Sequence, residues 1–203
     1  MARLVRRLLP LALLLAPALV HAQAAAENVW ARGTELGVVA GAATNAAATG
    51  PVLGGTAGWE VTRWFAVEGR GSWFWRGSGA EGFGADIGAL VNVIPKQRAT
   101  PFVTAAFGLY RASFDSPAAM VPAFYGRRMG SPGSPVRAGH YSFTDPALRL
   151  GGGIDLIVRR YFSLRPEVSV LLIRRGGAGT TLTTFGARLA YRFEDHPVTP
   201  NTR

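Results

Sequence analysis

Residues 61–75 read VTRWFAVEGRGSWFW, and this stretch decides the fold. From residue 65 onward its side chains alternate in character. One face consists of Phe65, Val67, Gly69, Gly71, Trp73 and Trp75, and the other of Ala66, Glu68, Arg70 and Ser72. Successive side chains of a β-strand point to opposite sides, so this alternation predicts a strand with one apolar and one polar face.

The same pattern recurs along the chain in eight segments: residues 34–44, 51–61, 65–75, 82–94, 102–114, 147–159, 162–174 and 181–193. In the fifth segment, Ala105, Ala106 and Gly108 give little contrast, and its register stays open by one residue. Short connections alternate with longer ones that are rich in Gly, Ser and Pro. Consecutive antiparallel strands put alternate connections at opposite ends of a sheet. One end therefore has the tight turns (62–64, 95–101, 160–161), and the other has the long loops (45–50, 77–81, 115–146, 175–180).

The polar face does not have the composition of a soluble surface. It is built mainly from small residues, with a few charges of both signs: Glu35, Glu60, Glu68, Asp86, Asp155 and Glu167 against Arg70, Arg149, Arg165 and Arg188. In a narrow polar lumen such charges must pair, because unpaired buried charges are costly. We therefore expect the polar face to line the inside of a barrel and the apolar face to point outward.

Strand length and aromatic placement favour a membrane barrel over a soluble ligand-binding barrel. Eleven residues at roughly 3.3 Å each, tilted by about 40°, rise close to 28 Å, which is near the height of an outer-membrane apolar band. Aromatic side chains gather at both segment ends, as expected for two interfacial belts. Trp64, Phe65, Phe102, Tyr161, Phe162, Tyr191 and Phe193 lie at the tight-turn end, and Trp73, Trp75 and Tyr110 lie toward the long-loop end.

The first 22 residues, MARLVRRLLPLALLLAPALVHA, predict a signal peptide. Three arginines precede an apolar run that is too short to span a membrane and contains two prolines. We predict that the mature chain begins near Gln23, with a barrel domain over residues 23–193 and a short polar tail over 194–203. The predicted location is the outer membrane, reached by export.

Composition narrows the classes of function. The 203-residue chain has no Cys, a formal net charge of +10 and a single lysine, Lys96, beside 21 arginines. The absence of Cys argues against a disulfide scaffold and Cys-based zinc sites. The basic residues are split between the two ends rather than forming one groove, so nucleic acid is not an expected partner.

The segments VTRWFAVEGRGSWFW and VRRYFSLRPEVSVLL (residues 158–172) resemble the strand-turn-strand units of small bacterial outer-membrane barrels, the OmpA/OmpX-like eight-stranded group. The resemblance implies an all-β, transmembrane, antiparallel up-and-down barrel with periplasmic termini, short periplasmic turns and extracellular loops. It also implies that Tyr191 and Phe193 help assembly factors to recognise the last strand. We expect eight strands. Two further strands within the long loop 115–146 would make ten.

No catalytic, cofactor-binding or metal site is predicted. Residues 77–82 match G-x-G-x-x-G, but a strand follows where a dinucleotide site needs a helix, so we interpret them as a hairpin loop. His140 and Ser142 on the long loop give a weak hypothesis of a lipid-modifying enzyme. The mature chain has only His140 and His196, which leaves metal binding unsupported. We expect a protein that is not an enzyme.

The arginines suggest lipid partners. Those at the long-loop end are Arg76, Arg127, Arg128, Arg137, Arg174 and Arg175. Guanidinium groups bind phosphate bidentately, so contact with lipopolysaccharide phosphates and solvated loop charges are both open interpretations. At the tight-turn end, Arg63, Lys96, Arg98, Arg159 and Arg160 are expected to snorkel to the membrane interface.

An eight-stranded barrel is just filled by its side chains, so a wide pore is not expected. The leading hypothesis is a monomeric structural or interaction protein of the outer membrane. It would display its loops to an extracellular ligand and support envelope integrity or adhesion. The alternative is a narrow porin-like channel or small-ligand conduit, favoured by the glycines of segments 82–94 and 147–159.

Overall fold

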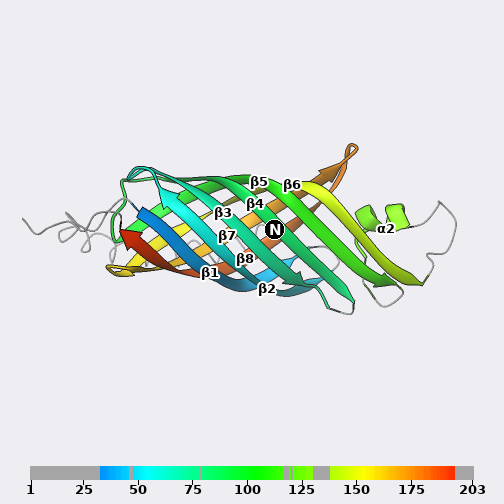
Figure 1. Ribbon diagram of the computed structural model, residues 1–203. Helices are drawn as coiled ribbons and strands as arrows, with labels where there is room; N and C mark the ends of the chain where they lie inside the picture. Colours follow the sequence, from blue (N-terminus) through cyan, green and yellow to red (C-terminus); the bar gives the residue numbers. More distant parts are fainter. Residues whose placement is uncertain are drawn as a thin grey trace, which may run out of the picture.

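The computed structural model describes residues 33–45, 48–77, 79–116, 119, 121–129 and 138–194. These residues form one closed antiparallel barrel with a short helix at one end (Figure 1). The elements are β1 (Gly33–Thr44), β2 (Thr49–Glu60), β3 (Phe65–Trp75), β4 (Ala80–Asn92), β5 (Ala99–Ser116), α2 (Ala123–Met129), β6 (Gly139–Arg159), β7 (Phe162–Arg175) and β8 (Ala178–Glu194). The predicted signal peptide and residues 195–203 lie outside the described residues.

Each strand pairs with its neighbours in the chain, and β1 pairs with β8 to close the ring. This confirms the up-and-down barrel of eight strands. The described part of the 115–146 segment adds no further strand. Instead β5 and β6 continue their ladder beyond the predicted ends, out to Ser116 paired with Gly139, and α2 lies between them in the chain. Residues 139–146 were expected to belong to the long loop, which is rich in Gly, Ser and Pro, but pairing with β5 holds them extended.

Side chains alternate between a polar lumen and an apolar outer face, as predicted. Large outward-facing side chains include Leu36, Val38, Leu53, Ile87, Phe107, Leu148, Val168 and Leu189, each at least 39% exposed. The open register of β5 is settled with its even-numbered residues inward. Phe102 and Tyr110 are therefore buried in the lumen, each 2% exposed. Their expected place in the outer aromatic belts was wrong, because weak contrast around Ala105 hid the inward parity.

Aromatic rings nevertheless form outward clusters at both ends. At the tight-turn end the ring of Tyr191 lies 6.0 Å from Tyr161, 5.2 Å from Phe162 and 4.7 Å from Phe193. At the long-loop end Trp73 lies 6.0 Å from Phe83. These clusters fit the two interfaces of a bilayer, where amphipathic rings are favoured.

Glycine sets the tight hairpins at the long-loop end. Gly176 and Gly177 both have positive φ, the conformation that a two-residue hairpin between β7 and β8 requires. Residues 77–82, the G-x-G-x-x-G match, lie in the β3–β4 hairpin, where the amide of Ala80 donates to the carbonyl of Gly77. The segment has a strand on both sides, in agreement with the hairpin interpretation.

Candidate functional site

The lumen contains a ladder of buried charges that closes the barrel over most of its length. Its members are the six predicted acids and four predicted bases, joined by Lys96 and Arg192. The ladder therefore pairs six acids with six bases. It extends from the tight-turn end, where β1 begins and β8 ends, toward α2 (Figure 1).

The lowest rung centres on Lys96 in the β4–β5 turn. Its ammonium contacts Glu60 and lies 2.6 Å from Asp155 Oδ2. Arg192 lies 3.3 Å from the same Glu60 carboxylate. The expectation that Lys96 snorkels to the membrane interface was wrong, since this side chain is 2% exposed. A turn residue has no strand parity, so the alternation could not show that it points inward.

The middle rung is held by two arginines from adjacent strands. Arg165 on β7 lies 3.1 to 3.2 Å from Glu35, Glu68 and Asp155. Arg188 on β8 lies 2.5 Å from Glu35 and also contacts Glu68. Gly37 makes room for this packing, because a Cβ there would lie 3.0 Å from the Arg188 side chain. The guanidinium of Arg165 also lies 5.1 Å from the centre of the Phe102 ring.

The upper rung consists of two Arg–carboxylate pairs. Arg70 donates to both oxygens of Glu167, at 2.9 and 2.6 Å. Arg149 lies 2.6 Å from Asp86 and 3.3 Å from Glu167. Arg70 is also 3.5 Å from Glu68, its neighbour on the same strand face. Because Glu167 binds Arg70 through both oxygens, the stronger partner comes from across the barrel.

Three carboxylates of the ladder lie close enough together to be considered as metal ligands. Glu35, Glu60 and Asp155 have oxygens within 4.8 Å of one another, and each has one oxygen without a hydrogen-bond partner. Their other oxygens contact Lys96, Arg165, Arg188 and Arg192. Because these basic groups already contact the carboxylates, the arrangement is one of paired buried charges. Such pairs hold a single geometry, because breaking one pair leaves the other charge buried and unpaired.

A small cavity of about 40 Å³ lies at the upper rung of the ladder. Its lining combines charged ladder residues, apolar residues such as Val52 and Leu171, and the hydroxyls of Ser72, Ser169 and Thr184. One water needs at least about 10–15 Å³, so the cavity has room for a few waters.

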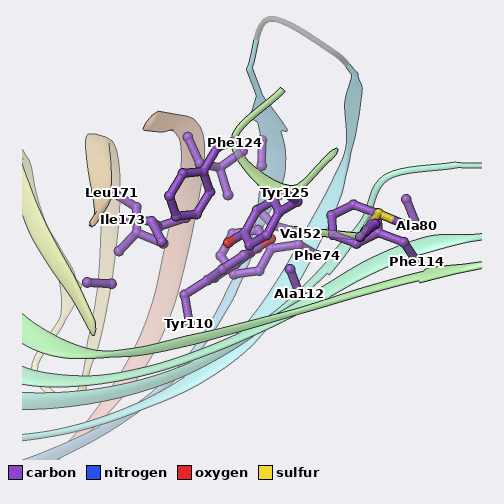
Figure 2. Packing of buried hydrophobic residues seen from close by; sticks show 14 residues of the cluster. Val52, Phe74, Ala80, Tyr110, Ala112, Phe114, Phe124, Tyr125, Leu171 and Ile173 are labelled. Carbon is purple, nitrogen blue, oxygen red and sulfur yellow. The ribbon is translucent and has the colours of Figure 1, made fainter. Parts of the chain in front are cut away.

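An apolar plug closes the lumen beyond this cavity. Phe124, Tyr125 and Met129 of α2 are buried against strand residues that point into the barrel mouth, among them Val52, Phe74, Tyr110, Phe114, Leu171 and Ile173. Figure 2 shows Tyr125 lying between Phe124 and Tyr110. The centre of the Tyr125 ring lies 5.1 Å from that of Phe114 and 5.5 Å from that of Phe143. Burial raises the pKa of the Tyr125 hydroxyl, so this group stays neutral at physiological pH.

An ion pair fastens the plug to the barrel wall. Arg128 of α2 lies 2.6 Å from Asp145 on β6, whose side chain is fully buried. Arg175 lies 3.3 Å from the other oxygen of Asp145. The Arg128 guanidinium also lies 4.4 Å from the centre of the Phe143 ring. Arg128 was expected either to contact lipopolysaccharide phosphates or to be a solvated loop charge, but the structure directs it to Asp145.

His140 and Ser142, the residues of the enzyme hypothesis, have different hydrogen-bond partners. His140 Nδ1 lies 2.7 Å from Asp115 on the exposed face, and Ser142 Oγ accepts a hydrogen bond from Arg111 Nε at 2.9 Å. Within the described residues no hydrogen bond joins Ser142 to His140. Arg76 lies near Tyr110 and donates to the carbonyl of Ala48, while Arg174 and Arg175 are exposed. Arg137 lies outside the described residues.

Comparisons with known proteins agree with this geometry. A family model described as outer membrane protein beta-barrel domain matches residues 11–193. The structure of Neisserial surface protein A (NspA) matches with a TM-score of 0.57 and 13% identity, over 80% of this chain and 97% of that one. The N-terminal β-barrel domain of Pseudomonas aeruginosa OprF matches with a TM-score of 0.50 and 12% identity, over 79% of this chain and 99% of that one.

No curated protein is significantly similar to the chain. Among the described residues, no helix is long and apolar enough to cross a membrane.

Proposed function

Because the chain belongs to the outer membrane protein beta-barrel domain family, we propose that it acts as a closed, non-conducting barrel with a structural or interaction role in the outer membrane. It supports envelope integrity or adhesion by presenting its long-loop end to the outside. In this proposal the chain is exported by a cleaved signal peptide over residues 1–22. N-terminal sequencing of the mature protein should then start at Gln23.

The observation that supports this role is the double closure of the lumen. The charge ladder fills the barrel from Glu60 up to Asp86, and the apolar plug of α2 fills the mouth. The two closures are different in kind, one ionic and one apolar, and a small cavity separates them. A barrel that is closed twice is suited to rigidity and display rather than to diffusion.

Conductance across a planar bilayer tests the proposal directly. The refolded protein, verified by a mobility shift between boiled and unboiled samples on SDS gels, should give no single-channel steps. Phe124→Ser/Tyr125→Ser should also stay closed, because the ladder remains below the plug. Regular steps from the wild-type protein would overturn the proposal.

A narrow conduit is the second candidate, and the hydroxyl-lined cavity is the observation that favours it. Conduction would require α2 to leave the mouth and the upper rung to rearrange. The variant that tests it combines Phe124→Ser/Tyr125→Ser with Arg70→Gln/Glu167→Gln. Steps in this variant but not in either parent would support a gated conduit.

We expect no catalytic activity at the long-loop end. Supporting this, the Ser142 hydroxyl is engaged by Arg111 rather than by a base. His140→Ala should therefore leave the acylation pattern of outer-membrane lipids unchanged, as judged by mass spectrometry. Loss of an acyl-chain modification in that variant would contradict the expectation.

A further inference from the structure

Two arginines interrupt the apolar outer face near the long-loop end. Arg111 on β5 and Arg174 on β7 are both exposed, and the alternation of their strands directs them outward. They lie on opposite sides of β6, two strand spacings or roughly 10 Å apart across the sheet. The nearby outward positions toward the barrel middle are apolar: Phe107, Leu109, Leu148 and Leu172.

The pairing of neighbouring strands places Arg111 at the height of the aromatic belt. Trp73 pairs with Phe83, Phe83 with Arg111, and Arg111 with Thr144, so these residues lie in one row around the barrel. Trp73 and Phe83 are each 42% exposed. Because such rings lie at the level of lipid headgroups, the guanidinium beside them lies there too.

A groove of about 390 Å³ runs along the outer face directly below Arg174. It is lined by Phe107, Pro146, Ala147, Leu148, Leu172 and Arg174. Apart from the arginine at its edge, these lining residues are apolar. A surface of this kind fits an amphiphile with an apolar chain in the groove and an anionic group at the guanidinium.

Neither arginine is neutralised by a carboxylate of the described residues. Arg174 has no ion pair or hydrogen bond with any of them, and Arg111 uses only its Nε, on Ser142. Two outward acids lie nearby. Asp115 is occupied by His140, and Glu81 lines a separate groove with Arg111 on the β3–β5 side. The groove at Arg174 contains no acid.

We propose that Arg111 and Arg174 bind the phosphate groups of a phosphorylated outer-leaflet glycolipid of the lipid A type, with one acyl chain in the Phe107–Leu172 groove. Guanidinium groups bind phosphate through two parallel hydrogen bonds, which a partner with two phosphates could use at both arginines. This inference rests on the proposed placement of the long-loop end in the outer leaflet, and it assigns a specific lipid contact to that end.

Native mass spectrometry of the refolded protein in detergent tests the proposal, with lipid A carrying two phosphates as the probe. Arg111→Gln/Arg174→Gln should bind this lipid about tenfold more weakly than the wild type, because charge-assisted hydrogen bonds are lost. The matched control is Arg98→Gln/Arg159→Gln, which removes the same charge from two exposed arginines at the tight-turn end. The control should bind like the wild type.

Two further probes separate the sources of affinity. Enzymatically dephosphorylated lipid A should bind the wild type and the double variant equally, and inorganic phosphate should not displace lipid A. The proposal would be overturned if the tight-turn control bound lipid A as weakly as the double variant, or if the double variant bound it as tightly as the wild type. Displacement of lipid A by inorganic phosphate would also overturn it. If binding fails while the gel shift and the closed lumen persist, the lipid contact is wrong and the proposed function stands.

Discussion

At the scale of single residues, the lumen is organised by pairing across the barrel rather than along a strand. Arg70 and Glu68 are neighbours on β3 and invite the interpretation of a pair, yet they are 3.5 Å apart while Arg70 holds both oxygens of Glu167. The alternation of β3 shows that these charges point inward, but it contains no information on which opposite strand supplies the partner. That choice depends on how the closed barrel brings β3 and β7 face to face.

A double-mutant cycle on Arg70 and Glu167 measures this pairing. Arg70→Gln and Glu167→Gln should each lower the free energy of unfolding by about 3 kcal/mol, since each leaves a buried charge without its partner. The double variant should lose clearly less than the two single losses combined. Urea titration of the protein in lipid vesicles gives the values, with Arg98→Gln as an exposed control. Additive losses would show that the two side chains act independently.

The hydroxyl of Tyr125 makes a second prediction at this scale. It is buried without a hydrogen-bond partner among the described residues. Removing an unpaired buried hydroxyl relieves a cost, so Tyr125→Phe should leave the free energy of unfolding unchanged or raise it by about 1 kcal/mol. Tyr125→Ala should lower it by about 3 kcal/mol, because the ring fills the plug. A loss in the Phe variant as large as in the Ala variant would mean that the hydroxyl has a partner.

At the scale of elements, α2 is the part that sequence reasoning missed. Its seven residues are too few to show helical periodicity and stand in a proline-rich segment, so they resembled loop. The helix is stabilised by tertiary packing of Phe124, Tyr125 and Met129 rather than by its own propensity. The eight strands, by contrast, were predictable because each has a long alternating pattern. The largest differences are the extended ends of β5 and β6 and the inward aromatics of β5, while the bounds of β2, β4 and β8 differ from the predicted segments by two or three residues.

The Arg128–Asp145 pair should control how firmly α2 is seated. Asp145→Asn leaves Arg128 without a charged partner, and we expect trypsin to cleave after Arg128 about tenfold faster. Mass spectrometry of the fragments measures that site separately from others. Asp115→Asn is the matched control, because it changes an exposed acid at the same end that pairs with His140. Similar cleavage rates in the two variants would show that the ion pair does not hold the helix.

At the scale of the whole molecule, the barrel has two distinct ends. The chain enters β1 and leaves β8 at the tight-turn end, whereas α2 lies at the other (Figure 1). The ladder is electrically balanced, so the net charge of +10 lies outside it, on the two ends and the terminal segments. The balance of acids and bases was visible in the sequence only in part, since Lys96 was assigned to the membrane interface.

Cysteine labelling of intact cells tests which end faces outward. The chain has no Cys, so a single introduced thiol gives an unambiguous readout. A membrane-impermeant maleimide should label Arg127→Cys, on the exposed face of α2, and should not label Arg98→Cys, at the tight-turn end, until the cells are lysed. Both positions are exposed in the folded protein. The reverse labelling pattern would show that the barrel is inserted the other way round.

The seam between β1 and β8 has a consequence for how the molecule is made. All twelve residues of β1, from Gly33 to Thr44, pair with β8 as well as with β2, so the ring is completed by partners about 140 to 160 positions apart in the chain. Such distant contacts form late, because the entropy of closing the intervening chain must be overcome first. Until β8 has been synthesised and delivered, β1 presents a bare strand edge that is prone to aberrant pairing. Assembly of the barrel is therefore expected to be all-or-none. Before the chain reaches the bilayer, chaperones are expected to protect its unpaired strand edges.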